Sequence, residues 1–310
     1  MTLQSILNQD YQGPSEVVVA EGQSQDSTRA LLETFADGDR RIKVVDNPTG
    51  RTPTALNLAL AVASGEVIVR CDAHAQLPPG YVSTAVTLLE ETGADNVGGA
   101  QIAIGSTPLE RAIALAMSSP LGAGDARYRL GGAAGPTDTV YLGVFRRAAL
   151  QRVGGYDESL DRNQDYELNI RLRQTGGTVY FHPDLAVLYR PRASLAGLWR
   201  QYFEYGRWKR VVLRRHPGSI RWRQLAAPAL VVGLGLSTVA WLTPLRRLAL
   251  VLPATYLATL TSGALWLGIR RREPAAVLIP AVAGVMHVAW GLGFIRGLDV
   301  RTTIDHTTTE

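Results

Sequence analysis

The sequence predicts an α/β domain with a mostly parallel sheet, followed by C-terminal transmembrane helices. Up to about residue 223, short β-branched runs alternate with segments of helical spacing. This alternation is typical of βαβ units, which build parallel sheets. Between residues 225 and 294 the chain is nearly uncharged, and only two arginine-containing segments, Arg246-Arg247 and Arg270–Glu273, interrupt the apolar residues.

The individual elements follow from valine-rich runs and from apolar residues at helical spacing. The expected strands are Glu16–Ala20, Arg41–Val45, Val67–Val69, Asn96–Ile104, Thr139–Phe145 and Thr178–Phe181. The expected helices are Thr2–Gln9, a segment from the Asp26 or Ser27 cap to Phe35, Thr54–Ala63, a helix within Pro78–Gly93, Leu109–Met117, Ala148–Val153, Asp161–Thr175 and Ser194–Arg215. The glycine- and alanine-rich segment Ser118–Gly135 has little periodicity and is expected to be a loop.

Three apolar stretches, Leu225–Leu242, Leu248–Ile269 and Ala275–Ile295, have 18 to 22 residues each. That length is enough to cross a bilayer of roughly 30 Å. A buried helical bundle is the alternative, but the lack of internal charge disfavours it. Basic loops favour the cytoplasm, which predicts a multi-pass protein of the cytoplasmic membrane with its globular domain in the cytoplasm. Arg246-Arg247 would then face outward, so the first span could instead be re-entrant.

Charge and cysteine content limit the partners and the disulfides that the protein can have. The net charge is +5, and much of the excess lies between Arg190 and Arg223, just before the apolar stretches. This arrangement indicates membrane lipids rather than nucleic acid as a partner. The single cysteine, Cys71, excludes an intrachain disulfide, and Met1–Gly13 lacks the pattern of a secretory signal. The helix at Ser194–Arg215 is amphipathic, and its apolar stripe would suit either a membrane interface or the protein core.

Acidic side chains follow several of the expected strands. Asp72 and His74 come directly after the strand Val67–Val69, and Glu21 and Asp26 come after the first strand. Ligands bind beyond the carboxyl ends of parallel strands, and a carboxylate and an imidazole there can share a divalent cation. The alternative for Asp72 and His74 is a polar turn. Asp165, near the start of a helix, is a further candidate.

Four blocks of the chain resemble the family 2 glycosyltransferases, which have the Rossmann-like GT-A fold of nucleotide-diphospho-sugar transferases. The blocks are EVVVAEGQSQDST (16–28), NPTGRTPTALNLALAVASGEVIVRCDAH (47–74), VGGYDESLDRNQDYELNIRLRQTGG (153–177) and QYFEYGRW (201–208). The third is the most specific. Within the family, the chain is most similar to the succinoglycan-type exopolysaccharide glucosyltransferases, whose metal motif also ends in histidine.

The resemblance implies roles for the acidic residues. Asp72 and His74 match the metal motif, so a divalent cation, Mn²⁺ or Mg²⁺, would join them to the diphosphate of a nucleotide-sugar donor. The histidine favours Mn²⁺. The donor is expected to be a UDP-sugar, because Glu21 stands where the family usually has an aspartate that contacts uridine. Asp26 matches the second acidic position of that loop.

The remaining roles also come from the resemblance. Arg51 and Asn57 lie where the family borders the nucleotide. Asp165 matches the catalytic base, which would deprotonate the acceptor hydroxyl during a single inverting displacement. The alternative for Asp165 is a carboxylate that stabilises a helix N-terminus. Arg207 and Trp208, preceded by Gln201, partly match the Gln-x-x-Arg-Trp motif of membrane glycan synthases, so Arg207 is expected at the diphosphate and Trp208 at the acceptor or as an interfacial anchor.

One departure from the family pattern lies at the start of the chain. Family members begin with a buried strand directly before the helix that Thr2–Gln9 is expected to form, and this chain starts at that helix. Because two neighbouring strands would then lack a partner, we expect the natural protein to begin upstream of Met1.

Together these features predict a membrane-attached inverting glycosyltransferase that acts on a lipid-linked or polysaccharide acceptor, alongside other polysaccharide-assembly enzymes. The expected division is a catalytic domain at 1–193, an amphipathic segment at 194–224, transmembrane helices at 225–296 and a polar tail at 297–310. The alternative is a catalytically degenerate nucleotide-sugar-binding scaffold, which Gln164 and the altered metal motif would suit. A transporter is disfavoured, because the apolar stretches lack charges that could carry a substrate.

Overall fold

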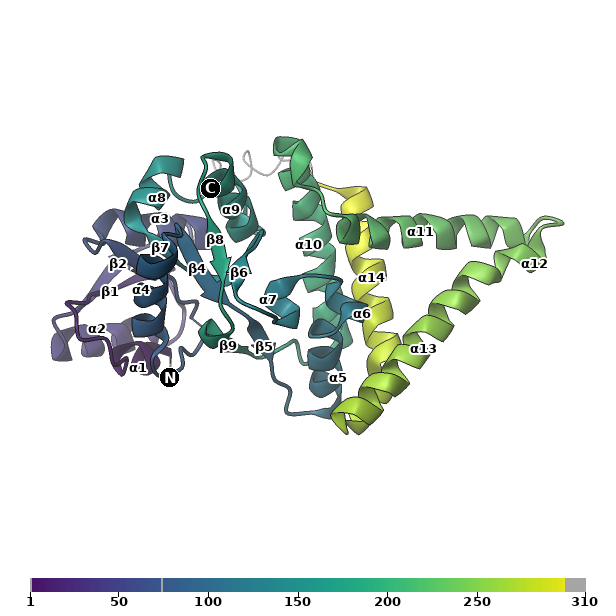
Figure 1. Ribbon diagram of the computed structural model, residues 1–310, viewed down its shortest axis with the longest axis horizontal. Helices are drawn as coiled ribbons and strands as arrows, with labels where there is room; N and C mark the ends of the chain where they lie inside the picture. Colours follow the sequence, from purple (N-terminus) through teal and green to yellow (C-terminus); the bar gives the residue numbers. More distant parts are fainter. Residues whose placement is uncertain (1, 74, 299–310) are drawn as a thin grey trace. The chain divides into compact units, whose positions relative to one another are not determined.

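The computed structural model describes residues 2–73 and 75–298, which form two compact units (Figure 1). We call residues 1–100 and 131–187 the sheet unit, and residues 101–130 and 188–310 the helical unit. The chain therefore leaves the sheet unit after residue 100 and returns at residue 131. The predicted domain boundaries after residues 193, 224 and 296 stay predictions.

The sheet unit alternates short strands with helices. Its strands are β1 (Val17–Glu21), β2 (Ile42–Asp46), β3 (Val67–Val69), β4 (Asn96–Gly99), β6 (Gly135–Pro136), β7 (Tyr141–Arg146) and β8 (Val179–Phe181). Its helices are α1 (Thr2–Leu7), α2 (Thr28–Gly38), α3 (Thr52–Val62), α4 (Tyr81–Thr92), α8 (Arg147–Val153), α9 (Gln164–Gln174) and the 3₁₀ helix η1 (Pro183–Leu185). The predicted strand Asn96–Ile104 is divided into two strands, β4 and β5 (Gln101–Ala103), because the chain passes to the other unit after residue 100.

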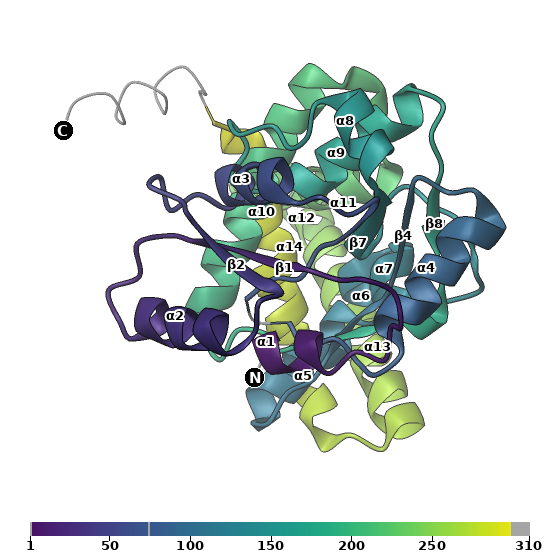
Figure 2. The ribbon, with the colours of Figure 1, turned by 90° about the vertical axis from the view of Figure 1, so that its left-hand side faces the viewer.

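The strands form two sheets in this unit. β1 and β2 lie side by side (Figure 2) and are parallel. Their register places Glu21 opposite Asp46 at the carboxyl ends. The second sheet has the order β3-β7-β4-β8-β6. β4 and β8 are parallel, but β7 is antiparallel to both β3 and β4, so the sheet is mixed rather than mostly parallel. A βαβ crossover makes consecutive strands parallel, but β4 and β7 are not joined by one. Between them the chain passes through residues 101–130 of the helical unit, so β7 can enter the sheet in the opposite direction.

The hydrophobic core of the sheet unit lies on both faces of the second sheet. β1 and β3 are end strands of their sheets. Val144 and Phe145 are adjacent on β7 and point to opposite faces. Val144 packs in a cluster with α4, whereas Phe145 packs in a cluster with α8 and α9. Helices therefore cover both faces of the second sheet.

The helical unit contains most of the remaining elements. They are β5 (Gln101–Ala103), α5 (Pro108–Met117), α6 (Pro120–Ala123), α7 (Arg127–Leu130), α10 (Leu195–Arg215), η2 (Pro217–Ser219), α11 (Trp222–Trp241), α12 (Arg246–Ala249), α13 (Val251–Arg271), η3 (Pro274–Leu278) and α14 (Ile279–Arg296). β9 (Val187–Tyr189) pairs with β5. The predicted loop Ser118–Gly135 was wrong in part, because α6, α7 and the first residue of β6 lie in it; each is too short to produce a detectable period.

Helices α10 and α14 pack closely along each other (Figure 1). Gly206 of α10 faces the Trp290 carbonyl and Gly293 of α14 faces the Phe203 carbonyl, so a Cβ at either position would collide with the opposite backbone. Small residues allow such close helix packing. In α10, Leu198 and Tyr202 are buried in the helical core, while Trp199 is 37% exposed. The amphipathic stripe therefore contributes to the core and to the surface.

Three helical segments are long and apolar enough to cross a membrane: Trp222–Trp241, Arg246–Arg271 and Pro274–Arg296. They coincide with the three predicted stretches. His287 in α14 pairs through Nδ1 with the Tyr256 hydroxyl (2.8 Å) and through Nε2 with the Leu121 carbonyl (2.7 Å). These contacts attach α14 to α13 and α6, which is the role of a packing histidine.

Candidate functional site

Arg70 connects the two carboxylates that the sequence predicts to be functional. Its Nε donates to Asp72 Oδ1 (2.9 Å), and its Nη1 forms an ion pair with Asp165 Oδ1. The Arg70 side chain is only 5% exposed, whereas those of Asp72 and Asp165 are 39% and 43% exposed. Residues far apart in sequence therefore lie beside one buried guanidinium, with both carboxylates accessible from solvent.

The environment of Arg70 favours its charged form. Burial acts against the charge, but Asp72 and Tyr156 outweigh it, so the pKa of Arg70 lies above its usual value. The Arg70 guanidinium also lies over the Tyr156 ring, with Cζ 5.7 Å from the centroid. Arg70 is therefore a fixed positive charge between Asp72 and Asp165.

Asp165 lies in the first turn of α9, and the segment before this helix is held by α3. Asn57 Nδ2 donates to the Tyr156 carbonyl (2.8 Å) and to Glu158 Oε1 (2.9 Å), and Asn57 Oδ1 accepts from the Tyr156 amide (2.8 Å). Arg51 Nε donates to Asp161 Oδ1 (2.8 Å). Arg51 and Asn57 thus fix the chain that leads to Asp165.

A glycine makes this attachment possible. Gly155 has φ +72°, and a Cβ there would lie 2.7 Å from Asn57 Oδ1. Glycine adopts positive φ without the steric penalty of other residues. The Gly154-Gly155 pair therefore lets the backbone approach Asn57 directly.

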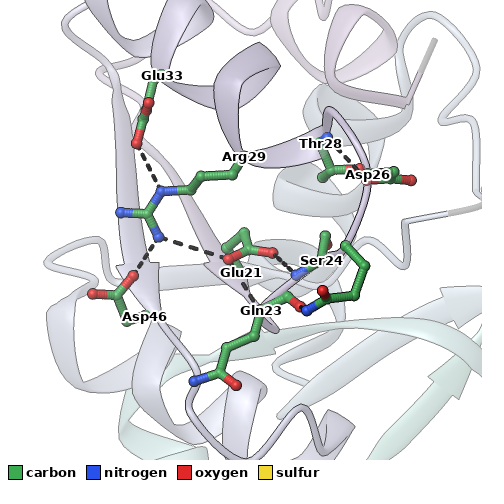
Figure 3. Close-up of polar contacts among 9 residues, drawn as sticks. Glu21, Gln23, Ser24, Asp26, Thr28, Arg29, Glu33 and Asp46 are labelled. Carbon is green, nitrogen blue, oxygen red and sulfur yellow. Dashed lines mark hydrogen bonds and ion pairs between the residues drawn. The ribbon is translucent and has the colours of Figure 1, made fainter.

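Glu21 forms a second polar cluster at the carboxyl ends of β1 and β2 (Figure 3). Its carboxylate accepts from the amides of Ser24 (2.7 Å) and Gln23 (3.2 Å), and Arg29 Nη1 lies 3.6 Å away. The Ser24 hydrogen bonds, followed by the Gln23 amide and the Arg29 charge, hold the pKa of Glu21 below its usual value despite burial. Glu21 is therefore a fixed, ionised end of this loop.

Arg29 and Asp26 shape the rest of the loop (Figure 3). Arg29 also pairs with Glu33 (2.8 Å) and with Asp46. Asp26 is exposed and accepts from the Thr28 amide (2.9 Å) at the start of α2, so hydrogen bonding at Thr28 lowers its pKa. Of the two expected caps of α2, the Asp26 side chain makes this hydrogen bond and Ser27 makes none.

Backbone contacts link the two clusters. The Glu21 carbonyl accepts from the Asn47 amide (2.8 Å), and Asn47 Nδ2 donates to the Arg51 carbonyl (3.1 Å). Arg51 in turn pairs with Asp161, close to Asp165. The Glu21 loop and the start of α9 are therefore attached to the same segment.

His74, the second predicted metal ligand, lies outside the described residues. Within residues 2–73 and 75–298, no group of three or more His, Cys, Asp or Glu side chains could hold a metal ion. Asp72 itself fits a hard cation, since its exposed carboxylate uses Oδ1 for Arg70. A cation bound through one or two carboxylates takes its remaining ligands from substrate phosphates and water.

Arg207 and Trp208 lie in the helical unit. Arg207 pairs with Glu204 (2.9 Å) and donates to the Gly297 carbonyl (3.3 Å). Trp208 is buried within the unit, at 5% exposure. Their predicted roles at the diphosphate and acceptor stay predictions.

Sequence reasoning missed Arg70, Tyr156 and Asp161. Arg70 had a detectable signal, because a charged residue at the end of the apolar strand Val67–Val69 needs partners when it is buried. Tyr156 and Asp161 had none, since their partners are more than 80 residues away along the chain: Asn57 contacts Tyr156, and Arg51 pairs with Asp161.

Comparisons with known proteins identify the family of this chain. The profile of "Glycosyl transferase family 2" matches residues 1–154. The succinoglycan biosynthesis protein ExoA of Rhizobium meliloti (strain 1021) is 33% identical over 289 residues, covering 92% of this chain and 86% of that protein. A further relative is the dolichyl N-acetyl-alpha-D-glucosaminyl phosphate 3-beta-D-2,3-diacetamido-2,3-dideoxy-beta-D-glucuronosyltransferase of Methanococcus voltae, 23% identical over 96% of this chain and 91% of its own length.

A solved structure shares the fold. The mannosyltransferase PcManGT from Pyrobaculum calidifontis, in complex with GDP-Man and Mn²⁺, superposes with a TM-score of 0.59 at 20% identity, over 93% of this chain and 81% of that one. At this identity the likeness concerns the fold, and it confirms the α/β class predicted from the sequence.

Proposed function

The chain belongs to glycosyltransferase family 2 and has the GT-A fold, and from this premise we propose that it is a membrane-attached inverting enzyme. It moves a sugar from a nucleotide-diphosphate donor, a UDP-sugar, to a lipid-linked or polysaccharide acceptor. The supporting observation is the Arg70 bridge, which holds Asp72 and Asp165 at one place in the sheet unit. Asp72 helps to bind the donor diphosphate through a cation, and Asp165 deprotonates the acceptor hydroxyl.

Asp165 acts as the general base. Its Oδ1 pairs with Arg70, and with 43% of the side chain exposed an acceptor hydroxyl can reach its second oxygen. The acceptor oxygen attacks the anomeric carbon while the bond from that carbon to the diphosphate oxygen breaks. Asp165 takes the hydroxyl proton, the diphosphate leaves with the bonding electrons, and the anomeric configuration inverts.

Arg70 fixes the geometry for this displacement. Its position between the carboxylates orients Asp165 toward the acceptor, and its charge prevents repulsion between Asp72 and Asp165.

A divalent cation, Mn²⁺ or Mg²⁺, would bind at Asp72 with His74 and neutralise the charge that develops on the diphosphate. Mn²⁺ is preferred because His74 is a softer ligand than a carboxylate. Glu21, Asp26, Arg51 and Asn57 border the nucleotide in this proposal, and the Glu21 and Arg51 loops are joined through Asn47.

The helical unit supports attachment to the cytoplasmic membrane. Its three long apolar helices are suited to cross a bilayer, with the sheet unit in the cytoplasm. The relatives named for succinoglycan biosynthesis and for a dolichyl-linked sugar phosphate favour an acceptor of the same chemical kind, and other polysaccharide-assembly enzymes as partners.

The test is a donor screen followed by product analysis. We expect one nucleotide sugar, with Mn²⁺, to raise the melting temperature of the purified full chain, because a ligand that binds only the folded state stabilises it. Proton NMR of the product formed from that donor should show an inverted anomeric configuration. Retention of configuration would contradict the assignment of Asp165 as base. Stabilisation by no nucleotide sugar would instead favour the degenerate scaffold.

A further inference from the structure

Three helical segments are long and apolar enough to cross a membrane, but they differ in burial. Over an apolar window of 18 residues, 44% of Pro274–Arg296 is buried, against 17% of Arg246–Arg271 and 6% of Trp222–Trp241. The buried residues of α14 form the helical core together with residues of α5 and α10 and one face of α13. On α11 and α13, large apolar side chains such as Leu236 and Leu265 are 64% and 66% exposed. Helix α14 is therefore covered by protein, whereas most of α11 and α13 is not.

Helices α11, α12 and α13 leave α14 and return to it, as a segment that we call the hairpin, residues 222–271 (Figure 1). The hairpin begins near the C-terminal end of α14: a Cβ on Gly291 of α14 would lie 2.6 Å from the Ala227 carbonyl of α11. Arg214, at the end of α10, donates to the Leu298 carbonyl just after α14 (3.3 Å). The hairpin ends at the other end of α14, because only a short turn with η3 separates α13 from α14 along the chain.

This arrangement limits which helices can cross one bilayer together. If α14 crossed it, the two ends of α14 would lie at opposite faces. The hairpin joins those ends, so it would have to connect opposite faces as well. Two helices that both cross return the chain to the face from which it started. Helices α11, α13 and α14 therefore cannot all cross the same bilayer.

The helix that packs along α14 decides between the two possibilities. At Gly206 of α10 and Gly293 of α14, the two backbones lie too close for a Cβ. Seven of the 21 residues of α10 are charged, from Arg200 to Arg215. Charged side chains within a bilayer are costly and rare. Because α14 cannot enter the hydrocarbon without α10, we expect it to remain outside.

The hairpin fits a bilayer in length and in charge. Helices α11 and α13 have 20 and 21 residues, so each is about 30 Å long, which matches a hydrocarbon core of roughly 30 Å. Within these two described helices, charged residues stand only near the ends that join α10 and η3. Arg221 and Arg223 lie at one of those ends and Arg270–Arg272 at the other, against Arg246 and Arg247 at the tip. Because basic residues are enriched on the cytoplasmic side, this distribution indicates entry from the cytoplasm.

We propose that the hairpin alone crosses the bilayer, as two helices connected by α12, and that α14 stays at the cytoplasmic face with α10. The hydrocarbon core of the bilayer is the partner of the exposed apolar side chains on α11 and α13. The inference deepens the proposed function and rests on it for attachment to the cytoplasmic membrane. It assigns two membrane spans where length alone admits three, and it places both ends of α14 on the same side of the membrane.

The test locates the tip of the hairpin and the C-terminus of the full chain, expressed in the inner membrane of a Gram-negative host. In a Cys71→Ala background, Thr243→Cys adds a cysteine at the exposed tip, and Asp184→Cys, at an exposed position of the sheet unit, is the matched control. We expect a membrane-impermeant maleimide to label Thr243→Cys in intact spheroplasts and Asp184→Cys only after lysis. Fused after Glu310, green fluorescent protein should fluoresce and alkaline phosphatase should be inactive, as they are in the cytoplasm.

An active phosphatase fusion without fluorescence would overturn the proposal, because it would place the ends of α14 on opposite sides. Labelling of Thr243→Cys only after lysis would also overturn it, by showing a hairpin that does not cross. If Thr243→Cys does not accumulate, Leu245→Cys at the same exposed tip decides by the same criterion. Release of the protein from membranes by alkaline carbonate would reject the hairpin together with the attachment. The expected sidedness in a protein that transfers no sugar would support the hairpin and reject only the proposed sugar transfer.

Discussion

Two arginines of this protein, Arg70 and Arg129, differ in their burial and in their partners. Arg70 of the sheet unit lies between the carboxylates of Asp72 and Asp165, whereas Arg129 of the helical unit lies among tyrosines. Burial opposes the charged form of both. The pKa of each nevertheless lies above its usual value, because of Asp72 and Tyr156 at Arg70 and of the neighbouring tyrosines at Arg129.

This difference separates a charge that is paired with carboxylates from one that lies among hydroxyls. The charge of Arg70 is used within the protein, where it holds two candidate catalytic groups in place. Among the residues that the structure describes, no carboxylate oxygen lies within 4.0 Å of the Arg129 guanidinium, and Arg129 is only partly buried. The partners of Arg70, rather than its residue type, therefore give it a positioning role.

The largest expected effect comes from Asp165→Asn, which keeps the Arg70 contact possible but removes the base. We expect kcat for sugar transfer to fall by about 10²–10⁴-fold, the range usual for a general base, with little change in the donor KM. Steady-state kinetics with the donor found in the screen measure this. Asp184→Asn, an exposed carboxylate of the sheet unit, is the control and should keep wild-type activity. An Asp165→Asn enzyme with wild-type kcat would exclude Asp165 as base.

Arg70→Gln tests the positioning role. It leaves Asp72 and Asp165 close together without a cation between them, so we expect a loss of about 2 kcal/mol in the free energy of unfolding. We also expect kcat to fall by about 10-fold or more, because Asp165 loses its orientation. Thermal unfolding and kinetics measure the two effects. Arg70→Lys should recover part of both, and unchanged kcat in Arg70→Gln would show that Arg70 has no part in positioning.

Asn57→Ala removes three hydrogen bonds between α3 and the segment before α9. We expect a loss of about 2 kcal/mol in stability and a smaller loss of kcat, since this segment leads to Asp165. Thr54→Ala removes one exposed hydrogen bond to Glu158 and should cost about 0.5 kcal/mol. Equal melting temperatures of the two variants would contradict the conclusion that Asn57 holds the segment before α9.

The smallest expected effect is on the pH dependence of stability, and it comes from Glu16, which is not one of the candidate site residues. Hydrogen bonds from Lys43 and from Ser64 hold the pKa of Glu16 at about 2, below its usual value of 4.5. Its contribution to stability is therefore complete above about pH 4.5 and is lost as the pH falls toward 2. Glu16→Gln should lower the melting temperature at pH 7 by the equivalent of about 1 kcal/mol and should flatten its decline in acid. An identical acid profile in the variant would contradict this.

The sequence predicts local features of the fold better than their spatial assembly. The strands β1, β2 and β3 and the three long apolar helices lie where valine runs and hydropathy place them. The antiparallel direction of β7 and the short helices α6 and α7 were not predictable. A strand's direction depends on where the chain re-enters the sheet, and four residues are too few to show a helical period.

Family resemblance selected Asp72 and Asp165, but neither residue's partner could be read from the sequence. The Arg70 bridge depends on β3 and α9 meeting in space, and the environment of Arg129 depends on α7 meeting α10. Arginine is common in this chain, so only burial distinguishes Arg70 from the exposed arginines. Burial is a tertiary property, which a single sequence does not reveal.

The most direct test of the account is calorimetry of UDP binding, with Mn²⁺, to the wild type, Asp72→Asn and Asp165→Asn. The account predicts that Asp72→Asn weakens UDP binding at least about tenfold, because it removes a cation ligand at the diphosphate. It predicts that Asp165→Asn binds UDP as the wild type does, while its kcat for sugar transfer falls by about 10²–10⁴-fold. Wild-type affinity in Asp72→Asn would contradict the claim that Asp72 and Asp165 divide the donor and acceptor roles of one site.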